Sequence, residues 1–372
     1  MKQAPMRVLL TVDSVGGVWQ YCLDLSRALG ERDVDTIVAV LGPSPGAAQR
    51  AEMRAIPHAR LVETGLPLDW LCDGPAPVLA AGARIAELAQ DEHVDLVQLN
   101  MPTLGAAAPL AVPVISVTHG CVSTWWQAAR PGVPLDPAFR WHRTLTGEGL
   151  RAADLVVAPS TCYARTVARH YGLGQTPLVV HNGRTPLISP NHPPVQDCVL
   201  TVGRLWDQVK RAALLDRVAG RLAIPFHAAG ATTGPHGETV ALENLHLLGE
   251  LDAQELAGHL AARPVFVSAA SFEPFGLAIL EAAAAGCALV LSDIPTFREL
   301  WNGAALFVAG DDEAGYAEAI ETLIGDCALR LQMGDAARAR AERYAPGTMA
   351  DAMLGLYARA LANGIPGRRV AA

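Results

Sequence analysis

Short apolar runs alternate with longer amphipathic stretches along almost the whole sequence. The runs are rich in Val, Leu and Ile and lack polar alternation, which is typical of strands buried on both faces. Helical patterns separate them, so the sequence predicts an α/β protein with parallel sheets and right-handed crossovers. The predicted strands span 7–12, 34–41, 94–99, 113–118, 154–158, 177–181, 197–202, 225–229, 244–248, 264–268, 287–291 and 304–308. The helical patterns include 17–30, 76–91, 160–171, 208–222, 252–262 and 277–286.

This alternation is interrupted once, at residues 182–197, where three prolines surround His192. Such a composition is typical of a linker, and 372 residues exceed the length of one ordinary domain. We therefore predict an N-terminal domain at 1–185 and a C-terminal domain at 196–346, with a helix at 347–363 that packs back onto the first domain. Each domain is expected to be a Rossmann-like, doubly wound sheet, with ligands at the carboxyl ends of its strands, facing a cleft between the domains.

Charge and cysteine content exclude several classes of protein. The 29 Lys and Arg against 37 Asp and Glu give a net charge of −8, so the basic excess that nucleic-acid binding requires is lacking. The seven cysteines are scattered and form no Cys-x-x-Cys pair, which indicates a reduced, cytoplasmic protein without a disulfide framework or zinc site. Prolines interrupt the uncharged stretch at 101–118, so no membrane span is expected, while peripheral membrane contact stays open.

Two carboxylates flank a predicted helix start in the second half. Glu273 precedes a proline, which disfavours a helical conformation there, and Glu281 follows eight residues later within an apolar helix. An ionised carboxylate in such surroundings is costly unless it faces a cleft or a ligand. The backbone amides of Phe275, Gly276 and Leu277 lie at the helix start, where a diphosphate can bind. Either carboxylate alone would be read as an ordinary surface acid, but the combination indicates a ligand site.

A pair of cations follows the first strand of the second half. Arg204 comes directly after Gly203, and Lys210 lies near the next helical pattern. A guanidinium binds phosphate as a planar fork and an ammonium binds it as a point charge. The two side chains are therefore candidates for binding a diphosphate.

Two segments of the first half also follow predicted strands. Gly16 and Gly17 come after the first strand, where paired glycines let the backbone approach a ligand. They do not form the Gly-x-Gly-x-x-Gly fingerprint, so a dinucleotide cofactor is poorly supported. His119 follows the strand at 113–118, which would place it at the same edge of the sheet.

Taken in order, these segments resemble family 4 of the retaining glycosyltransferases, which have the GT-B fold. The resemblance runs over nearly the whole chain. It is strongest at Glu273-Pro-Phe-Gly-Leu and Glu281, which match the family's Glu-x7-Glu motif, and at Gly203-Arg204 with Lys210. It extends to Gly16-Gly17, His119, 153–160 and 181–183.

This resemblance implies a role for each candidate in the second half. Glu281 would hold the ribose hydroxyls of the donor, and Glu273 would bind hydroxyls of the sugar. Arg204 and Lys210 would bind the diphosphate and stabilise the charge of the leaving group. The amides of 275–277 would complete the phosphate cradle.

For the first half, the resemblance implies that the Gly16-Gly17 loop contributes to the same cradle and that His119 lies near the transferred sugar. One departure concerns the two cations, which five residues separate where many family members have four. Trp125 and Trp126 could line an acceptor groove or pack in the core.

The function that this resemblance implies is retaining transfer of a hexose from a UDP- or GDP-linked donor to a hydroxyl acceptor, in polysaccharide or glycoconjugate synthesis. The acceptor would be a sugar, a lipid-linked compound or a small molecule. No cofactor and no metal are predicted, since Asp33-Val34-Asp35 matches the metal-binding Asp-x-Asp pattern only formally and precedes the second strand. The base pocket is expected near 248–252.

Three other functions stay open. A non-catalytic, sugar-nucleotide-binding paralogue would have the same fold, although all the candidate residues are present. An epimerase or an inverting transferase is the second alternative, and a nicotinamide-dependent dehydrogenase the third. The sequence does not identify the base or the sugar of the donor, or the acceptor. The linkage formed and the oligomeric state also stay open.

Overall fold

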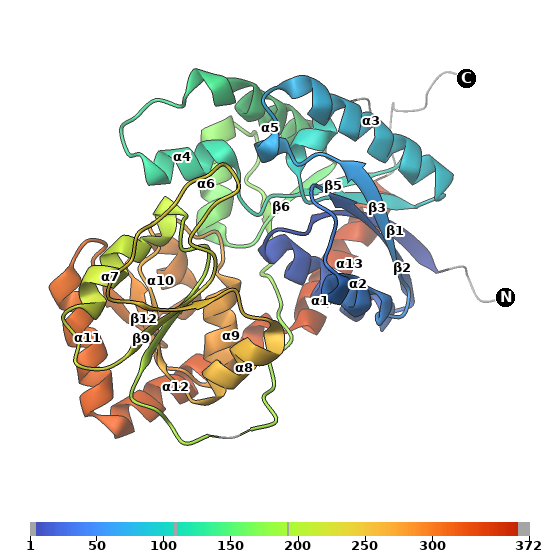
Figure 1. Cartoon of the computed structure of the whole chain (residues 1–372). Coiled ribbons are helices and arrows are strands. Elements are labelled where there is room, and N and C mark those ends of the chain that lie inside the picture. Colours follow the sequence, from blue (N-terminus) through green and yellow to red (C-terminus); the bar gives the residue numbers. More distant parts are fainter. Residues whose placement is uncertain (1–4, 108–109, 192, 364–372) are drawn as a thin grey trace. The chain divides into compact units, whose positions relative to one another are not determined.

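The computed structural model describes residues 5–107, 110–191 and 193–363. It divides the chain into two compact units (Figure 1). Unit 1 comprises Met1–Gly183 and Pro346–Ala372, and unit 2 comprises Arg184–Ala345. Among the described helices, none is both long and apolar enough to cross a membrane.

Unit 1 is built around a seven-stranded sheet in which every pairing is parallel. Its strands are β1 (Met6–Asp13), β2 (Val34–Leu41), β3 (Ala59–Leu66), β4 (Leu96–Leu99), β5 (Val114–Val117), β6 (Leu155–Ala158) and β7 (Leu178–Val179). They lie in the order β3-β2-β1-β4-β5-β6-β7, so the order reverses between β1 and β4. Ligands of doubly wound sheets bind beyond the carboxyl ends of the strands at such a reversal.

Helices cover both faces of this sheet (Figure 1). The apolar core of one face includes side chains of α1 (Gly17–Gly30) and α13 (Pro346–Ala362), and that of the other includes side chains of α3 (Pro75–Asp91). The chain thus returns to unit 1 at its end, and Tyr357 of α13 is fully buried in the core. The remaining helices of unit 1 are α2 (Ala47–Arg54), η1 (Asp69–Leu71), η2 (Pro102–Ala106), α4 (Val122–Ala129), η3 (Pro137–Phe139), α5 (Arg140–Ala152) and α6 (Thr161–Tyr171).

Unit 2 repeats this plan with six parallel strands. They are β8 (Val199–Val202), β9 (Phe226–Ala229), β10 (His246–Gly249), β11 (Val265–Ser268), β12 (Leu289–Ser292) and β13 (Leu306–Val308). The order β10-β9-β8-β11-β12-β13 reverses between β8 and β11. The prediction of two Rossmann-like, doubly wound parallel sheets is therefore confirmed.

Two apolar clusters form the core of unit 2, one on each face of its sheet. One includes side chains of α7 (Ala212–Ala219) and α11 (Glu313–Gly325). The other includes side chains of α8 (Ala253–Ala261), α9 (Leu277–Ala285), α10 (Pro295–Trp301) and α12 (Cys327–Ala341). Two short turns complete the unit, η4 (Gln208–Lys210) and η5 (Glu342–Tyr344).

The single helix predicted at 208–222 is wrong. The side chain of Asp207 accepts a hydrogen bond from the amide of Val209 and starts the short turn η4. Arg211 then adopts a left-handed conformation with φ of 56°, which ends this turn before α7 begins. The break places Lys210 in η4, ahead of the helix.

Candidate functional site

In unit 2, the loops after β8 and β11 lie side by side where the strand order reverses. The amide of Ser271, in the loop after β11, donates a hydrogen bond of 2.8 Å to the carbonyl oxygen of Val209 in η4. This bond joins the loop that carries Glu273 to the turn that carries Lys210. Lys210 and Glu273, which are far apart in the sequence, therefore lie next to each other in unit 2.

Lys210 and Glu273 form an ion pair between these two loops. Their side chains are 23% and 18% exposed, so both are largely buried but still reach solvent. Of the 29 Lys and Arg residues only two are lysines, Lys2 and Lys210. Lysine is a compact charge on a flexible stem, unlike the planar guanidinium fork of arginine. Its use here, in a chain that uses arginine almost everywhere else, singles out this position.

Arg204 lies on the other side of the same turn. Its Nη2 donates a hydrogen bond of 2.9 Å to Oδ2 of Asp207, and its guanidinium carbon lies 5.5 Å from the ring centroid of Trp206. Asp207 is buried, whereas the Arg204 side chain is 48% exposed. The longer segment between the two cations thus supplies the carboxylate that both starts η4 and holds Arg204. Arg204 keeps a solvent-facing surface for an anion.

A close backbone approach was not predicted from the sequence. A Cβ atom at Gly230, directly after β9, would lie 1.8 Å from the carbonyl oxygen of Gly203, so any larger residue would push these strand ends apart. The φ of Gly230 is 132°, a region that also favours glycine. Gly230 therefore fixes the position of Gly203, the residue that leads into Arg204.

Gly276 forms the start of α9 in a left-handed conformation, with φ of 96°. The buried ring of Phe275 packs edge-on against Tyr344, with centroids 5.5 Å apart. Leu277 begins the helix, which runs for nine residues. The backbone amides of a helix's first turn lack partners within the helix and carry partial positive charge. The helix thus starts at the residue that the sequence predicted, and the binding of an anion there stays a prediction.

Glu281 lies within α9 and has a partner that the sequence analysis did not identify. Its Oε1 accepts a hydrogen bond of 2.6 Å from Nε of Arg184, and the two side chains are only 10% and 9% exposed. The charged carboxylate of Glu281 can thus be buried in an apolar helix, because the guanidinium of Arg184 compensates its charge. Arg184 stands in the linker segment, where no periodicity or spacing connects it with Glu281. It is a second candidate residue beside the predicted one.

In unit 1, the loop after β1 is shaped by its own side chains. Oδ1 of Asp13 accepts hydrogen bonds from the amides of Val15 and Gly16, at 3.0 and 3.1 Å. Gly16 has extended backbone angles, and a Cβ atom there would have Asp13 as its nearest neighbour, 4.0 Å away. The fold itself therefore does not require glycine at 16. The predicted close approach of a ligand would explain why glycine stands at this position, and the geometry around Gly16 leaves room for it.

His119 follows β5 and contacts Asn100, which follows β4. Its Nε2 lies 3.0 Å from Oδ1 of Asn100, and its ring packs edge-on against Tyr21 of α1, with centroids 4.5 Å apart. Burial lowers the pKa of His119 to about 4, so the ring is neutral at neutral pH. Because α1 begins at Gly17, the contact with Tyr21 joins the two candidate segments of unit 1.

For Trp126, packing in the core is the correct interpretation. Its side chain is buried, and its Nε1 donates hydrogen bonds to the carbonyl oxygens of Val133 and Pro134. Arg130 lies over its ring, 4.2 Å from the centroid. Trp125 is half-buried and stays a candidate for contact with an acceptor.

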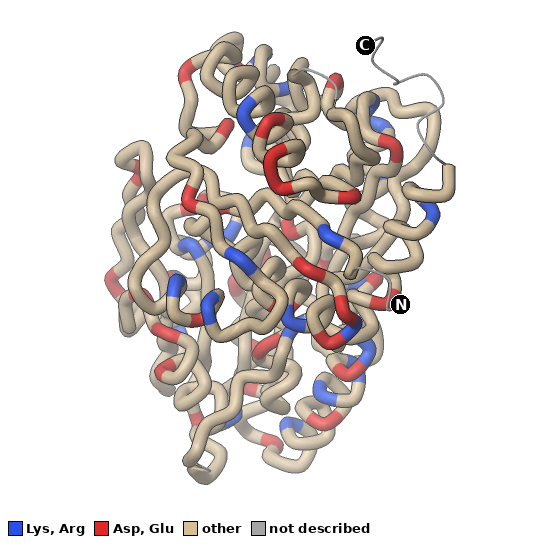
Figure 2. The backbone as a smooth tube through the Cα atoms, turned by 90° about the vertical axis from the view of Figure 1, so that its right-hand side faces the viewer, with Lys and Arg blue, Asp and Glu red and all other residues tan. Residues whose placement is uncertain are grey.

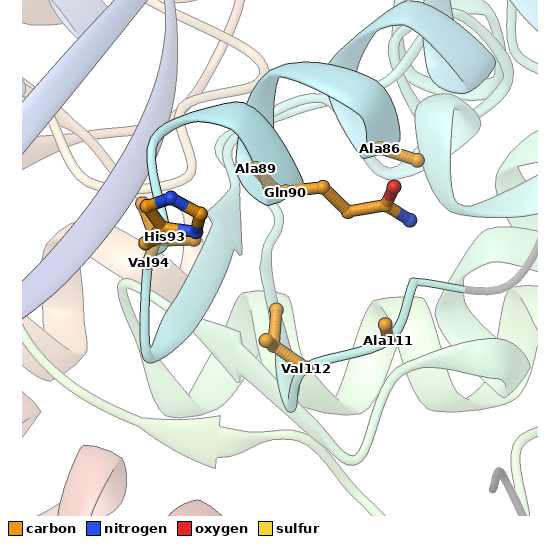
Figure 3. A pocket seen from close by; sticks show the side chains of 7 residues that line it. All are labelled: Ala86, Ala89, Gln90, His93, Val94, Ala111 and Val112. Atoms are coloured by element: carbon orange, nitrogen blue, oxygen red, sulfur yellow. The ribbon is translucent and has the colours of Figure 1, made fainter.

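Two cavities of unit 1 are lined by none of the candidate residues Gly16, Gly17 and His119. The larger, about 430 Å³, is lined by the end of α3 and by the segment before β5 (Figure 3). Figure 3 shows Gln90 and His93 at its rim opposite Val112. The second, about 290 Å³, includes Arg7, Asp35 and His58 and lies near the starts of β1, β2 and β3. Both are at the amino ends of strands, opposite the edge where doubly wound sheets bind ligands.

Two family descriptions match the sequence in succession. Glycosyltransferase Family 4 matches residues 15–185, and Glycosyl transferases group 1 matches residues 196–326. A D-inositol 3-phosphate glycosyltransferase of Kineococcus radiotolerans is 27% identical over 93% of this chain and 91% of its own length. A glycogen synthase of Mycobacterium tuberculosis is 26% identical over 88% of this chain and 86% of its own length.

Solved structures resemble the fold of the chain. Sucrose-phosphate synthase from Thermosynechococcus elongatus superimposes with a TM-score of 0.80, at 18% identity, over 96% of this chain and all of the other. Anabaena HepE, solved in complex with UDP and glucose, superimposes with a TM-score of 0.73, also at 18% identity, over 95% of this chain and all of the other. The fold is thus that of the GT-B glycosyltransferases.

Proposed function

Because this chain belongs to family 4 of the glycosyltransferases, we propose that it transfers a hexose from a UDP- or GDP-linked donor to a hydroxyl group, with retention of configuration. The observation that carries the proposal is the pairing of Lys210 with Glu273 beside Arg204, at the strand reversal of unit 2. These residues supply two cations for a diphosphate and one carboxylate for hydroxyl groups of the sugar.

In the proposed reaction, the bond between the sugar and the diphosphate oxygen breaks, and the acceptor hydroxyl oxygen forms the new bond on the same face. The proton of that hydroxyl passes to the departing diphosphate oxygen. Negative charge grows on the departing diphosphate, and Arg204 and Lys210 stabilise it. The amides of 275–277 add further donors at the start of α9. Glu273 accepts from hydroxyl groups of the sugar, and Glu281, held by Arg184, accepts from the ribose hydroxyls.

In unit 1, we assign the Gly16-Gly17 loop and His119 to the recognition of the donor's phosphate and sugar. The open space around Gly16 supports a close backbone approach, and the neutral His119 ring suits recognition of hydroxyl groups better than neutralisation of charge. HepE was solved with UDP and glucose, which supports the same class of donor for this chain.

The acceptor is, in this proposal, a sugar, a lipid-linked compound or a small molecule, in polysaccharide or glycoconjugate synthesis. The names of the relatives, which include an inositol phosphate glycosyltransferase and a glycogen synthase, span small and polymeric products. Nucleic acid is not among the proposed partners, since acidic and basic residues are interspersed along the chain in Figure 2 and the net charge is −8. The free cysteines suit a reducing, cytoplasmic location.

The nucleotide specificity can be measured by thermal stabilisation with UDP, GDP and ADP and their glucose or mannose conjugates. A ligand at 100 times its dissociation constant adds about 2.7 kcal/mol to the stability of the protein that binds it. We expect one nucleotide series to stabilise the wild type and Glu281→Ala to lose the effect. The absence of stabilisation by every nucleotide at millimolar concentration would contradict the proposal.

A protein that binds donor without turnover would be the non-catalytic paralogue. Analysis of the anomeric configuration of the product then separates a retaining transferase from an inverting one, and release of an isomerised sugar without an acceptor would identify an epimerase. The presence of Glu273, Arg204 and Lys210 favours the catalytic alternative.

We further propose that transfer needs no metal ion, because two cationic side chains already face the predicted diphosphate site. Asp35 of the Asp-x-Asp pattern lies near the start of β2 and pairs with His58 at 3.0 Å. We expect EDTA to leave the initial rate of transfer unchanged within about twofold, since the electrostatic stabilisation comes from side chains and backbone amides. Loss of activity with EDTA and its return with added Mg²⁺ or Mn²⁺ would show that the proposal is wrong.

A further inference from the structure

A chain of buried hydrogen bonds connects the last helix of unit 1 with His119. The hydroxyl of Tyr357, in α13, donates to Oε1 of Gln98 at 2.5 Å. Nε2 of Gln98 donates to Oδ1 of Asn100 at 3.1 Å, and the same oxygen lies 3.0 Å from Nε2 of His119. Nε2 of Gln98 also donates to the hydroxyl of Tyr21 at 3.1 Å. Tyr357 and Gln98 are fully buried and Asn100 is nearly so.

The donors and acceptors in this series of hydrogen bonds fix the direction of each bond. Nδ2 of Asn100 donates to the backbone carbonyl oxygen of Thr11 at 2.8 Å, which turns Oδ1 toward the histidine. A carboxamide oxygen can only accept, so Nε2 of His119 has to carry the hydrogen. In a neutral imidazole the other nitrogen, Nδ1, then has a free lone pair and acts as an acceptor.

The surroundings of the ring favour this neutral form. Burial lowers the pKa of His119. Tyr21, Cys22 and Tyr357 surround this hydrogen-bond network, and burial raises the pKa of all three, so they are uncharged near neutral pH. The nearby anion is Asp13, whose charge also raises the pKa of Cys22 and whose Oδ1 accepts from the amides of Val15 and Gly16. The pKa of His119 is nevertheless lowered by burial, so desolvation outweighs attraction by Asp13 and the ring presents one donor and one acceptor.

We propose that Tyr357, Gln98 and Asn100 are positioning residues that hold His119 in the tautomer with hydrogen on Nε2, so that Nδ1 accepts a hydrogen bond from a hydroxyl of the transferred sugar. This inference rests on the role proposed above for His119. It makes α13 part of the sugar-recognition machinery, although Tyr357 itself lies in the core and contacts no substrate.

Removal of the Tyr357 hydroxyl tests the direction of the hydrogen bonds that lead from Tyr357 to His119. In Tyr357→Phe, Oε1 of Gln98 loses its donor, so the amide of Gln98 can turn and bring Oε1 against Oδ1 of Asn100. Repulsion between the two oxygens then opposes the bond from Nδ2 of Asn100 to Thr11, so Asn100 no longer has one preferred orientation. If Asn100 turns Nδ2 toward the ring, the histidine has to accept at Nε2, and its hydrogen moves to Nδ1. Nitrogen NMR of the full chain with ¹⁵N-labelled histidine reads the tautomer directly, and a His119→Gln spectrum assigns the signal.

We expect the wild type to show hydrogen on Nε2 and Tyr357→Phe to show a mixture of tautomers. Tyr316→Phe removes a buried tyrosine hydroxyl in unit 2 and serves as the matched control, in which the His119 signal stays unchanged. Hydrogen on Nδ1 in the wild type, or a cationic ring at neutral pH, would overturn the proposal whether or not the protein transfers sugar.

Binding then tests the sugar contact, with UDP and UDP-glucose as probes, or GDP and GDP-mannose if the nucleotide series selects GDP. Tyr357→Phe should leave the affinity for the nucleotide unchanged and reduce the extra affinity for the sugar conjugate according to the fraction of the wrong tautomer, by about twofold for an equal mixture. An unchanged preference for the conjugate would overturn the assignment of Nδ1. If neither nucleotide series binds the wild type, the proposed function fails instead.

Asn100→Asp tests the role of Asn100 through the pH dependence of sugar binding, which a purely structural role of this residue would not change. A carboxylate beside the ring raises the pKa of His119, so the ring is protonated below this raised pKa and Nδ1 becomes a donor. The preference for the sugar conjugate should then fall as the pH drops from about 8 to about 6, whereas the wild type keeps its preference over this range. A variant without this pH dependence would overturn the proposed role of Asn100.

Discussion

Lys210→Ala is expected to lower the rate of sugar transfer by about 100- to 1000-fold, the effect of losing one donor that stabilises charge in a transition state. The ammonium lies at the strand reversal of unit 2 and pairs with Glu273. Its charge is needed most when the diphosphate departs, so the turnover number should fall more than the affinity for the donor. Steady-state kinetics with the donor that the nucleotide series selects measures both quantities.

Arg217→Ala is the matched control for this variant. It also removes a cation from unit 2, but Arg217 is 56% exposed and pairs with Glu313 on the surface. Its turnover should stay within about twofold of the wild type, because exposed ion pairs contribute little. If Lys210→Ala itself stays within about twofold, Lys210 has no part in the mechanism.

The scarcity of lysine allows a second measurement that does not depend on turnover. An amine-selective reagent has only two lysine targets in the chain, Lys2 and Lys210. We expect the nucleoside diphosphate that binds to protect Lys210 and to leave the reaction of Lys2 unchanged. Peptide mass spectrometry reports the two sites separately, and equal labelling of Lys210 with and without nucleotide would contradict its role in diphosphate binding.

The sequence predicted most strands from their apolar runs and missed β3, whose side chains alternate between half-buried and exposed. The run at 34–41 ends in five successive apolar residues, 37–41, and forms β2 over the predicted range. β3, at the edge of the sheet, has half-exposed side chains and a sequence that includes Arg60 and Glu63. Its polar alternation weakens the signal on which the other predictions rest, because the edge of a sheet faces water along one side.

Candidate residues could be identified from the sequence where they stand directly after a strand or at a helix start. Their partners could not, because those contacts join distant segments. Arg184 meets Glu281 across 97 positions, and Tyr357 meets Gln98 across 259. A lone arginine in a proline-rich linker and a tyrosine in an amphipathic helix look like ordinary residues of those elements. Only the folded arrangement shows that Arg184 compensates Glu281 and which groups surround the ring of His119.

Arg184→Met is expected to destabilise unit 2 by about 3–5 kcal/mol, because it leaves the carboxylate of Glu281 buried without its cation. The side chains of both residues are about nine-tenths buried, and the bond between them is 2.6 Å long. Urea unfolding followed by hydrogen exchange measures the effect, since peptides of α9 report on unit 2 and peptides of α13 on unit 1. The exposed pair Arg217–Glu313 gives the control, where Arg217→Met should cost about 1 kcal/mol or less.

The double variant Arg184→Met with Glu281→Leu separates folding from binding. A buried ion pair can often be replaced by apolar residues of similar volume at little or no cost, so the double variant should regain most of the stability that Arg184→Met loses. Stabilisation by nucleotide should not return, because the carboxylate proposed to hold the ribose is gone. If the double variant still binds nucleotide as the wild type does, Glu281 does not contact the ribose, and the pair serves only to join α9 to the segment that begins unit 2. If Arg184→Met instead costs less than about 1 kcal/mol, water reaches the pair in solution and Arg184 does not determine the position of Glu281.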